Sequence, residues 1–243
     1  MALTKCRAIV IKTVHYSESS VVLKCFTDKY GLQSYMVNGV RSKKGSIRNS
    51  QLQPLTLLEL ETYHQENKNL KRIKELKCFP MLRHIHYEVI HSAVGIFISE
   101  LLNKCIREED HTDLPLFEFL FHSIQILDIE NETLANFPAY FMLQLTRYLG
   151  FFPKGEYSDS TNSLDIREGY FTFHDHLNSF HLGPELSVQI SQLLKTDFRT
   201  LGTLRLSRDQ RHSLIGHLTT FYSIHISGFG EMRSNKVLNE VLS

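Results

Sequence analysis

The stretch "CRAIVIKTVHYSESSVVLKCFTDKYGLQSYMV", residues 6–37, decides the fold of the first third of the chain. It holds three short runs rich in Val, Ile, Thr, Tyr and Phe, at 6–14, 20–27 and 32–37. Runs of this kind, partly alternating and separated by turn residues such as "DKYG", are typical of β-strands. The pattern therefore predicts short antiparallel strands near the start of the chain.

Two later runs continue the pattern. They are "LTLLELETY" at 55–63 and "LKRIKEL" at 70–76, and they bring the predicted strands within the first 80 residues to five. Five short strands make a small barrel or sandwich, and a five-stranded barrel with a basic surface is typical of the OB-fold, which holds single nucleic-acid strands.

The hydrophobic period changes at Pro80. Apolar residues then recur at helical spacing, and the first set predicts a long amphipathic helix. Its members are Ile85, Val89, Val94, Phe97, Ile98, Leu101, Leu102 and Cys105. Four more helical patterns follow at 114–127, 136–150, 183–194 and 207–226, and Pro and Gly mark several of their ends. The fold class is thus α+β, with an OB-fold at 1–80 and a mostly α-helical domain at 81–243.

A polar segment interrupts the helices. Residues 153–183 are rich in Ser, Asp and Gly, which predicts a long loop, with a short hairpin at "GYFTF". We expect the loop aromatics Tyr170, Phe171 and Phe173 to pack onto the helices.

Overall composition is that of a globular protein. The 243 residues are 42 % hydrophobic and 22 % charged, enough for a sizeable core and about two domains. The start lacks a secretory signal and no apolar run is long enough to span a membrane, so we expect a soluble cytoplasmic protein. Four scattered cysteines form no CxxC pair, which indicates reduced thiols and neither disulfides nor a thiolate zinc site.

Charge divides the chain more sharply than its net value of +1 suggests. Residues 1–80 contain 14 Lys and Arg against 6 Asp and Glu, a balance of +8, whereas residues 81–243 contain 13 against 20, a balance of −7. A basic first half indicates a polyanionic partner for that half.

Much of this basic charge lies in "VNGVRSKKGSIRN", residues 37–49. Between residues 29 and 58 the only charged residues are Lys29, Arg41, Lys43, Lys44 and Arg48. Such Gly-punctuated cations can follow a phosphate backbone without reading sequence, although a solvated hairpin is the simpler alternative. Tyr30, Tyr35 and Phe26 are candidate platforms on which bases could stack.

The chain also resembles a known family. The motifs that carry the resemblance are "AIVIKTVHYSESSVVLKCFTDKYG", "GVRSKK" and "LQP" in the first half, then "LRHIHYEVIHSAVGIFISELL", "LFEFLFHSIQIL", "FMLQLTRYLGFFP" and "HISGFGEMRSNKVLNEVL". In this order and spacing they resemble the RecO DNA-repair proteins, the bacterial recombination mediators, over nearly the whole chain.

The resemblance implies a protein without catalytic activity or cofactor that works by binding, in the cytoplasm and at the nucleoid. Its partners would be single- and double-stranded DNA, single-strand-binding protein, RecR and, indirectly, RecA, and it would anneal complementary strands. Carried over by position, the DNA-binding loop falls on Arg41, Lys43, Lys44 and Arg48, with Lys12 as a further candidate.

The same resemblance suggests a site for the acidic, apolar tail of single-strand-binding protein near Phe141, Leu145 and Arg147, where an apolar groove beside a cation would suit a peptide ending in a carboxylate. Two departures from the family pattern stand out. The segment after "LG" lacks the four zinc cysteines of many relatives, and Ala139 and Tyr140 stand where some relatives have arginines.

Two other classes of function stay open at this stage. The basic barrel could dock an acidic protein surface as an adaptor, without binding DNA. A metal hydrolase is the third alternative, because "FHDHLNSFH" contains His174, Asp175, His176 and His181, and an H-x-H spacing can bind a transition metal. No P-loop, GxSxG, HExxH or GxGxxG motif occurs.

Overall fold

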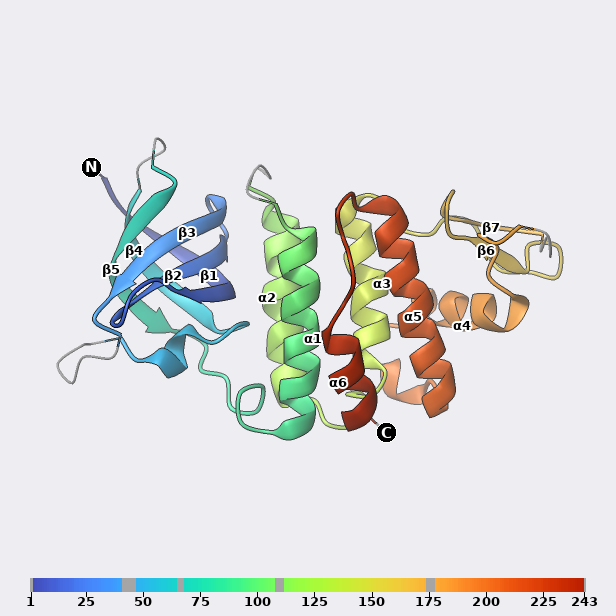
Figure 1. Cartoon of the computed structure of the whole chain (residues 1–243). Helices are drawn as coiled ribbons and strands as arrows, with labels where there is room; N and C mark the ends of the chain where they lie inside the picture. Colours follow the sequence, from blue (N-terminus) through green and yellow to red (C-terminus); the bar gives the residue numbers. More distant parts are fainter. Residues whose placement is uncertain (1, 41–46, 65–67, 108–111, 174–177, 243) are drawn as a thin grey trace. The chain divides into compact units, whose positions relative to one another are not determined.

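The chain forms two compact units, residues 1–129 and 130–243. The structure is a computed structural model (Figure 1), and it describes residues 2–40, 47–64, 68–107, 112–173 and 178–242. That residues 1–80 and 81–243 are separate domains stays a prediction.

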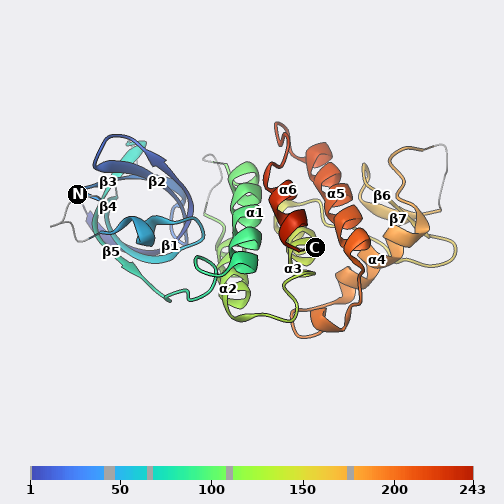
Figure 2. The same ribbon diagram turned by 60° about the horizontal axis from the view of Figure 1, so that its bottom comes forward.

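Five strands form a closed barrel in the first unit (Figures 1 and 2). They are β1 (Ala2–His15), β2 (Ser20–Thr27), β3 (Gly31–Asn38), β4 (Leu57–His64) and β5 (Leu70–Cys78). Around the barrel the order is β1-β2-β3-β5-β4; β3 and β5 pair in parallel and the other pairs are antiparallel. A closed five-stranded barrel of this topology is the OB-fold, so the predicted fold is confirmed.

The barrel core follows from the alternation of side chains along each strand. Inward positions of β2 are Val21, Leu23 and Cys25, which pack with Tyr35 and Val37 of β3. A bulge between Val10 and Lys12 shifts the register of β1 against β2. Near this point β1 leaves β4, and the backbone of Leu55 and Thr56 bonds to Val10 instead.

Two helices complete the first unit, α1 (Val89–Cys105) and α2 (Leu114–Ile129). The Ser99 hydroxyl of α1 donates to the carbonyl of Ile11 in β1 at 3.1 Å, and Phe117 of α2 lies 6.1 Å from Phe26 of β2, centroid to centroid. Helix α1 is thus hydrogen-bonded to the barrel wall, and α2 packs an aromatic ring against it.

A buried carboxylate joins the connection before α1 to helix α2. Asp128 accepts hydrogen bonds from the backbone N–H groups of Arg83, His84 and Ile85, at 2.8, 2.8 and 3.0 Å. Three donors satisfy a charge that would otherwise be costly to bury, so this connection is held in one conformation.

The second unit is mostly helical, as predicted. It contains α3 (Phe137–Leu149), α4 (Pro184–Lys195), α5 (Arg208–His225) and α6 (Ser234–Val241). The phenol of Tyr222 on α5 donates to the carbonyl of Met142 on α3 at 2.7 Å. The short helix α6 was not among the helices predicted from the apolar pattern. Of the described helices in either unit, none is long and apolar enough to cross a membrane.

The polar segment contains a two-stranded hairpin, β6 (Ser163–Asp165) and β7 (Tyr170–Thr172), as the sequence suggested. It is held by buried polar contacts: the hydroxyl of Ser163 donates to the carbonyl of Leu182 at 2.6 Å, and His181 lies 3.3 Å from Asp165. Of the three loop aromatics, only Phe171 is buried. The predicted packing of Tyr170 and Phe173 is wrong, because both side chains are exposed.

Candidate nucleic-acid interface

One end of the barrel, where β1 turns into β2, gathers cations. Lys12 is exposed on β1 and lies opposite Lys24 of β2 in the register. The turn that follows is closed by the N–H groups of Tyr16 and Ser17, which donate to the carbonyl of Ser20 at 3.0 and 3.1 Å.

The described residues that flank the basic segment on either side lie at this same end of the barrel. The N–H of Val40, the last described residue before the segment, donates to the carbonyl of Ser19 at 3.0 Å. After the segment, the carbonyl of Leu52 accepts a hydrogen bond from the hydroxyl of Thr13, next to Lys12. We call this surface, formed by Lys12, the turn at 16–19, Val40 and Arg48, the Lys12 end.

The predicted loop residues fall partly within the described structure. Arg41, Lys43 and Lys44 lie outside the described residues. Arg48 is exposed at the start of a short 3₁₀ helix, Asn49–Leu52, and its N–H donates to the side chain of Gln51 at 2.8 Å.

Charges at the Lys12 end are not neutralised by neighbouring acids. Within the described ranges, no ion pair involves Lys12 or Arg48, and Glu18 is the acid of the nearby turn. Cations without a protein counter-charge carry mobile counterions, which a phosphate backbone can displace.

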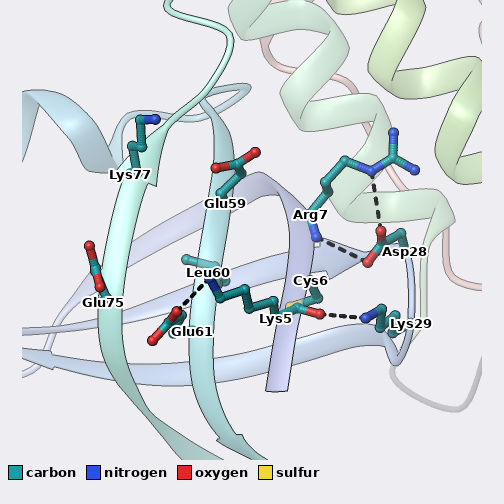
Figure 3. A pocket seen from close by; sticks show the side chains of 10 residues that line it. All are labelled: Lys5, Cys6, Arg7, Asp28, Lys29, Glu59, Leu60, Glu61, Glu75 and Lys77. Atoms are coloured by element: carbon teal, nitrogen blue, oxygen red, sulfur yellow. Dashed lines mark hydrogen bonds and ion pairs between the residues drawn. The ribbon is translucent and has the colours of Figure 1, made fainter. Parts of the chain in front are cut away.

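A different part of the barrel is also rich in cations, but acids of equal number lie among them. A pocket of about 500 Å³ lies over β1, β4 and β5 (Figure 3). It is lined by Lys5, Cys6, Arg7, Asp28, Lys29, Glu59, Leu60, Glu61, Glu75 and Lys77. Four of these are cations and four are acids, so the lining has no net charge.

Several charges in and beside this pocket pair directly. Lys5 lies 2.9 Å from Glu61, and Lys74 reaches the same carboxylate at 3.4 Å. The hydrogen bond from Lys5 lowers the pKa of Glu61, which stays ionised.

Arg7 lies at the other edge of the same surface and binds two acids. It contacts Asp28 at 3.2 Å and also Glu118 of α2, and its guanidinium lies 5.1 Å above the ring of Phe117. We call the surface formed by Lys5, Arg7, Asp28, Glu61 and Glu118, with the neighbouring Lys74, the paired face.

The chemistry of the pocket gives no activated nucleophile. Burial raises the pKa of the Cys6 thiol to about 11, so the thiol is protonated at neutral pH and is a poor nucleophile. The neighbouring Glu61 has a lowered pKa, whereas a general acid needs a raised one.

The prediction of aromatic stacking platforms is wrong for two of the three candidate residues. Tyr35 is fully buried, because it occupies an inward position of β3 in the barrel core, and no base can reach its ring. Phe26 is fully buried as well, against α2. Tyr30 packs partly against the core. The exposed aromatic at the Lys12 end is Tyr16, which the sequence reasoning missed.

The predicted tail-binding residues do not form an open groove. Phe141 and Leu145 are fully buried, and Phe141 stacks on Phe137 at 6.1 Å. Arg147 is exposed, with its guanidinium 4.0 Å above the ring of Phe152. Positions i and i+4 share one face of a helix, whereas i and i+2 do not, so Arg147 lies away from the other two. The two buried side chains therefore offer no open surface themselves, and tail binding near these residues stays a prediction.

Only one of the four candidate metal ligands, His181, belongs to the described residues. His174, Asp175 and His176 lie outside the described residues, and His181 pairs with Asp165. Across the ranges that the structure covers, no three His, Cys, Asp or Glu side chains are placed to hold a metal ion.

Comparisons with known proteins cover nearly the whole chain. The model described as "Recombination protein O N terminal" matches residues 1–80, and that described as "Recombination protein O C terminal" matches residues 86–234. Relatives named "DNA repair protein RecO" include that of Flavobacterium psychrophilum, 36 % identical over 98 % of this chain and 99 % of its own length. Those of Christiangramia forsetii, with 34 % identity over 97 % of each chain, and Bacteroides fragilis, with 31 % over 98 % and 99 %, are also similar. An OB-fold barrel joined to a helical region, matched over both parts by these models and relatives, makes this chain a member of the RecO family of DNA repair proteins, with a role in recombinational repair.

Proposed function

We propose that the protein is a non-catalytic DNA-binding mediator of recombination, which holds the phosphate backbone at the Lys12 end. The observation that carries the proposal is the pair of exposed cations, Lys12 and Arg48, without ion-pair partners among the described residues, at the end of the barrel where the basic segment leaves and returns. We include Arg41, Lys43 and Lys44 in the proposal because they lie between Val40 and Arg48 in the sequence.

The mechanism needs only charge and proximity. Lys and Arg neutralise phosphates and release condensed counterions, which makes binding tight at low salt and largely independent of base sequence. A protein that holds two complementary strands raises their effective concentration for each other. Annealing then needs neither a cofactor nor nucleotide hydrolysis.

Family membership supports the partners in this proposal. We place the protein on DNA coated with single-strand-binding protein, where it acts with RecR to promote loading of RecA. The buried Phe141 and Leu145 carry no part of this proposal, and Arg147 is left as an exposed cation on α3.

The test compares two variants that remove equal charge from the two surfaces. In the first, Arg41, Lys43, Lys44 and Arg48 are changed to Ala; in the second, the changes are at Lys5, Lys29, Lys74 and Lys77. Anisotropy of a labelled single strand is measured between about 50 and 200 mM salt.

We expect the first variant to lose affinity by about 100-fold or more and to lower the salt slope by about 3, since each phosphate contact to a single strand contributes about 0.7. The second variant stays within about threefold of wild type, since Lys5 and Lys74 already share the carboxylate of Glu61 and the pocket lining around them has no net charge. A salt-insensitive complex, or equal losses in both variants, would contradict the proposal. If wild type binds no DNA, the adaptor function with an acidic protein partner replaces it.

A further inference from the structure

The outer side of β1, β2 and β3 carries an uncovered apolar row at the Lys12 end. In the register Val14 lies opposite Val22, and Val22 lies opposite Met36. Val14 is 47 % exposed and the other two are half-buried. They face outward because the alternating residues of the same strands, such as Leu23 and Val37, fill the core.

The two sides of this row differ in chemistry. On one side lie Lys12 and its cross-strand neighbour Lys24. On the other side, Tyr16 continues the alternation of Lys12 and Val14 and is 69 % exposed. Successive outward positions on a strand lie about 7 Å apart. A cation and an apolar side chain thus follow one another along β1, and the aromatic residue Tyr16 comes directly after its last residue.

Hydrogen bonds of the turn fix the backbone of Tyr16 before any ligand arrives. Its own N–H donates to the carbonyl of Ser20 at 3.0 Å, and the neighbouring Ser19 accepts from Val40 at 3.0 Å. A ring presented by an ordered turn loses little entropy when a ligand stacks on it. The backbone of the turn therefore supports a binding role for the ring.

The combination selects one kind of occupant. Cations are sufficient to bind phosphates. An exposed ring and an apolar row favour a ligand that also has a flat apolar surface. A single strand offers both phosphates and flat apolar surfaces, because its bases are unpaired and each has a π-face. In a duplex the base faces are stacked on one another and only the edges are accessible.

We propose that Tyr16, with the row of Val14, Val22 and Met36, is a stacking platform for unpaired bases, and that it makes the Lys12 end prefer single strands over duplex. This inference rests on the proposed DNA-binding function. It assigns to Tyr16 the role that the sequence reasoning gave to the buried Tyr35.

Two substitutions at Tyr16 separate stacking from charge. Tyr16→Ala is expected to weaken single-strand binding roughly tenfold, with the salt slope and the duplex affinity unchanged because no cation is removed. Tyr16→Phe keeps the ring and is expected to retain wild-type affinity. Equal losses on single strand and duplex, or no loss in Tyr16→Ala, would overturn the inference.

The absence of tryptophan from the chain provides a direct reporter. Tyr16→Trp introduces a single indole, whose fluorescence is quenched when a base stacks on it. The matched control is Tyr87→Trp, at a position that is 73 % exposed and belongs to the connection before α1. We expect a thymidine oligonucleotide to quench the indole at residue 16 and not the one at residue 87.

An abasic strand of equal length tests the same point from the ligand side. It carries the phosphates without the bases, so it should bind the Tyr16→Trp protein without quenching. If the abasic strand quenches as strongly as the thymidine strand, the ring senses only the backbone and the platform is refuted. Failure of the proposed function would look different, because wild type would then bind neither single strand nor duplex.

Discussion

The Lys12 end and the paired face belong to one barrel and are both rich in lysine and arginine, yet they present different charges to a ligand. On the paired face Lys5 and Lys74 share the carboxylate of Glu61, and Arg7 is divided between Asp28 and Glu118. At the Lys12 end, Lys12 and Arg48 are exposed and form no ion pair with another described residue.

This difference shows that the number of cations on a surface does not by itself identify a binding site for a polyanion. A lysine that already holds a carboxylate gains little from a phosphate, because the first interaction must be given up and both groups desolvated again. A cation that holds only mobile counterions gains their release. The charge balance of the first 80 residues therefore overstates the area that can bind DNA.

The largest expected effect comes from removing the described cations of each surface in turn. Lys12→Ala with Arg48→Ala should weaken binding of a single strand by about 10- to 30-fold near 0.1 M salt and lower the salt slope by about 1.4. Lys5→Ala with Lys74→Ala should change affinity less than about twofold. Anisotropy titrations of both variants, with circular dichroism to verify folding, decide the comparison; a similar loss in both would abolish the distinction.

A smaller effect of opposite sign comes from releasing the paired cations. Glu59→Gln with Glu61→Gln leaves Lys5 and Lys74 without their carboxylate, and should raise DNA affinity by about three- to fivefold and the salt slope by about 1. The matched control is Glu130→Gln with Glu132→Gln in the second unit, for which no change is expected. Unchanged affinity in the first variant would mean that geometry, and not pairing, keeps DNA away from the paired face.

The barrel could be predicted from the sequence because strand alternation is a local property. In runs such as 20–27 and 32–37 alternate side chains point inward, and this period is visible in the sequence. The helices α3, α4 and α5 were predicted for the same reason, from apolar spacing. By contrast α6 is only eight residues long, too short for a convincing pattern.

What could not be predicted depends on pairings between distant segments. Lys5 meets Glu61 because β1 and β4 are neighbours in a register that places these two residues opposite each other. A slip of one residue would have turned one of them to the other face. Tyr35 is buried because it shares the inward side of β3 with Val37. Tyr16 is exposed because it lies beyond the end of β1.

The burial of Phe141 and Leu145 has a related cause. Their spacing on α3 was visible in the sequence, but an apolar pair at i and i+4 marks the buried face of a helix more often than a groove. Their complete burial, with Phe141 stacked on Phe137, follows that rule.

The smallest expected effect concerns stability and completes the comparison, since charges on the paired face should hold the fold together. The hydrogen bond from Arg7 lowers the pKa of Glu118. The carboxylate therefore contributes stability fully above its unfolded pKa of about 4.3, and this contribution is lost as the pH falls through the lower folded value.

Glu118→Gln should accordingly destabilise the first unit by about 0.5 kcal/mol at pH 7, a value reduced for the solvent exposure of the pair, and by nothing once the pH lies below the folded pKa. Hydrogen exchange of the β1 and α2 amides is the suitable measurement, because the two units need not unfold together. Glu18→Gln, at the Lys12 end, is the control and should leave exchange unchanged at either pH. A pH-independent loss in Glu118→Gln would show that the side chain acts through packing, and the stabilising role of the paired charges would then have to be abandoned.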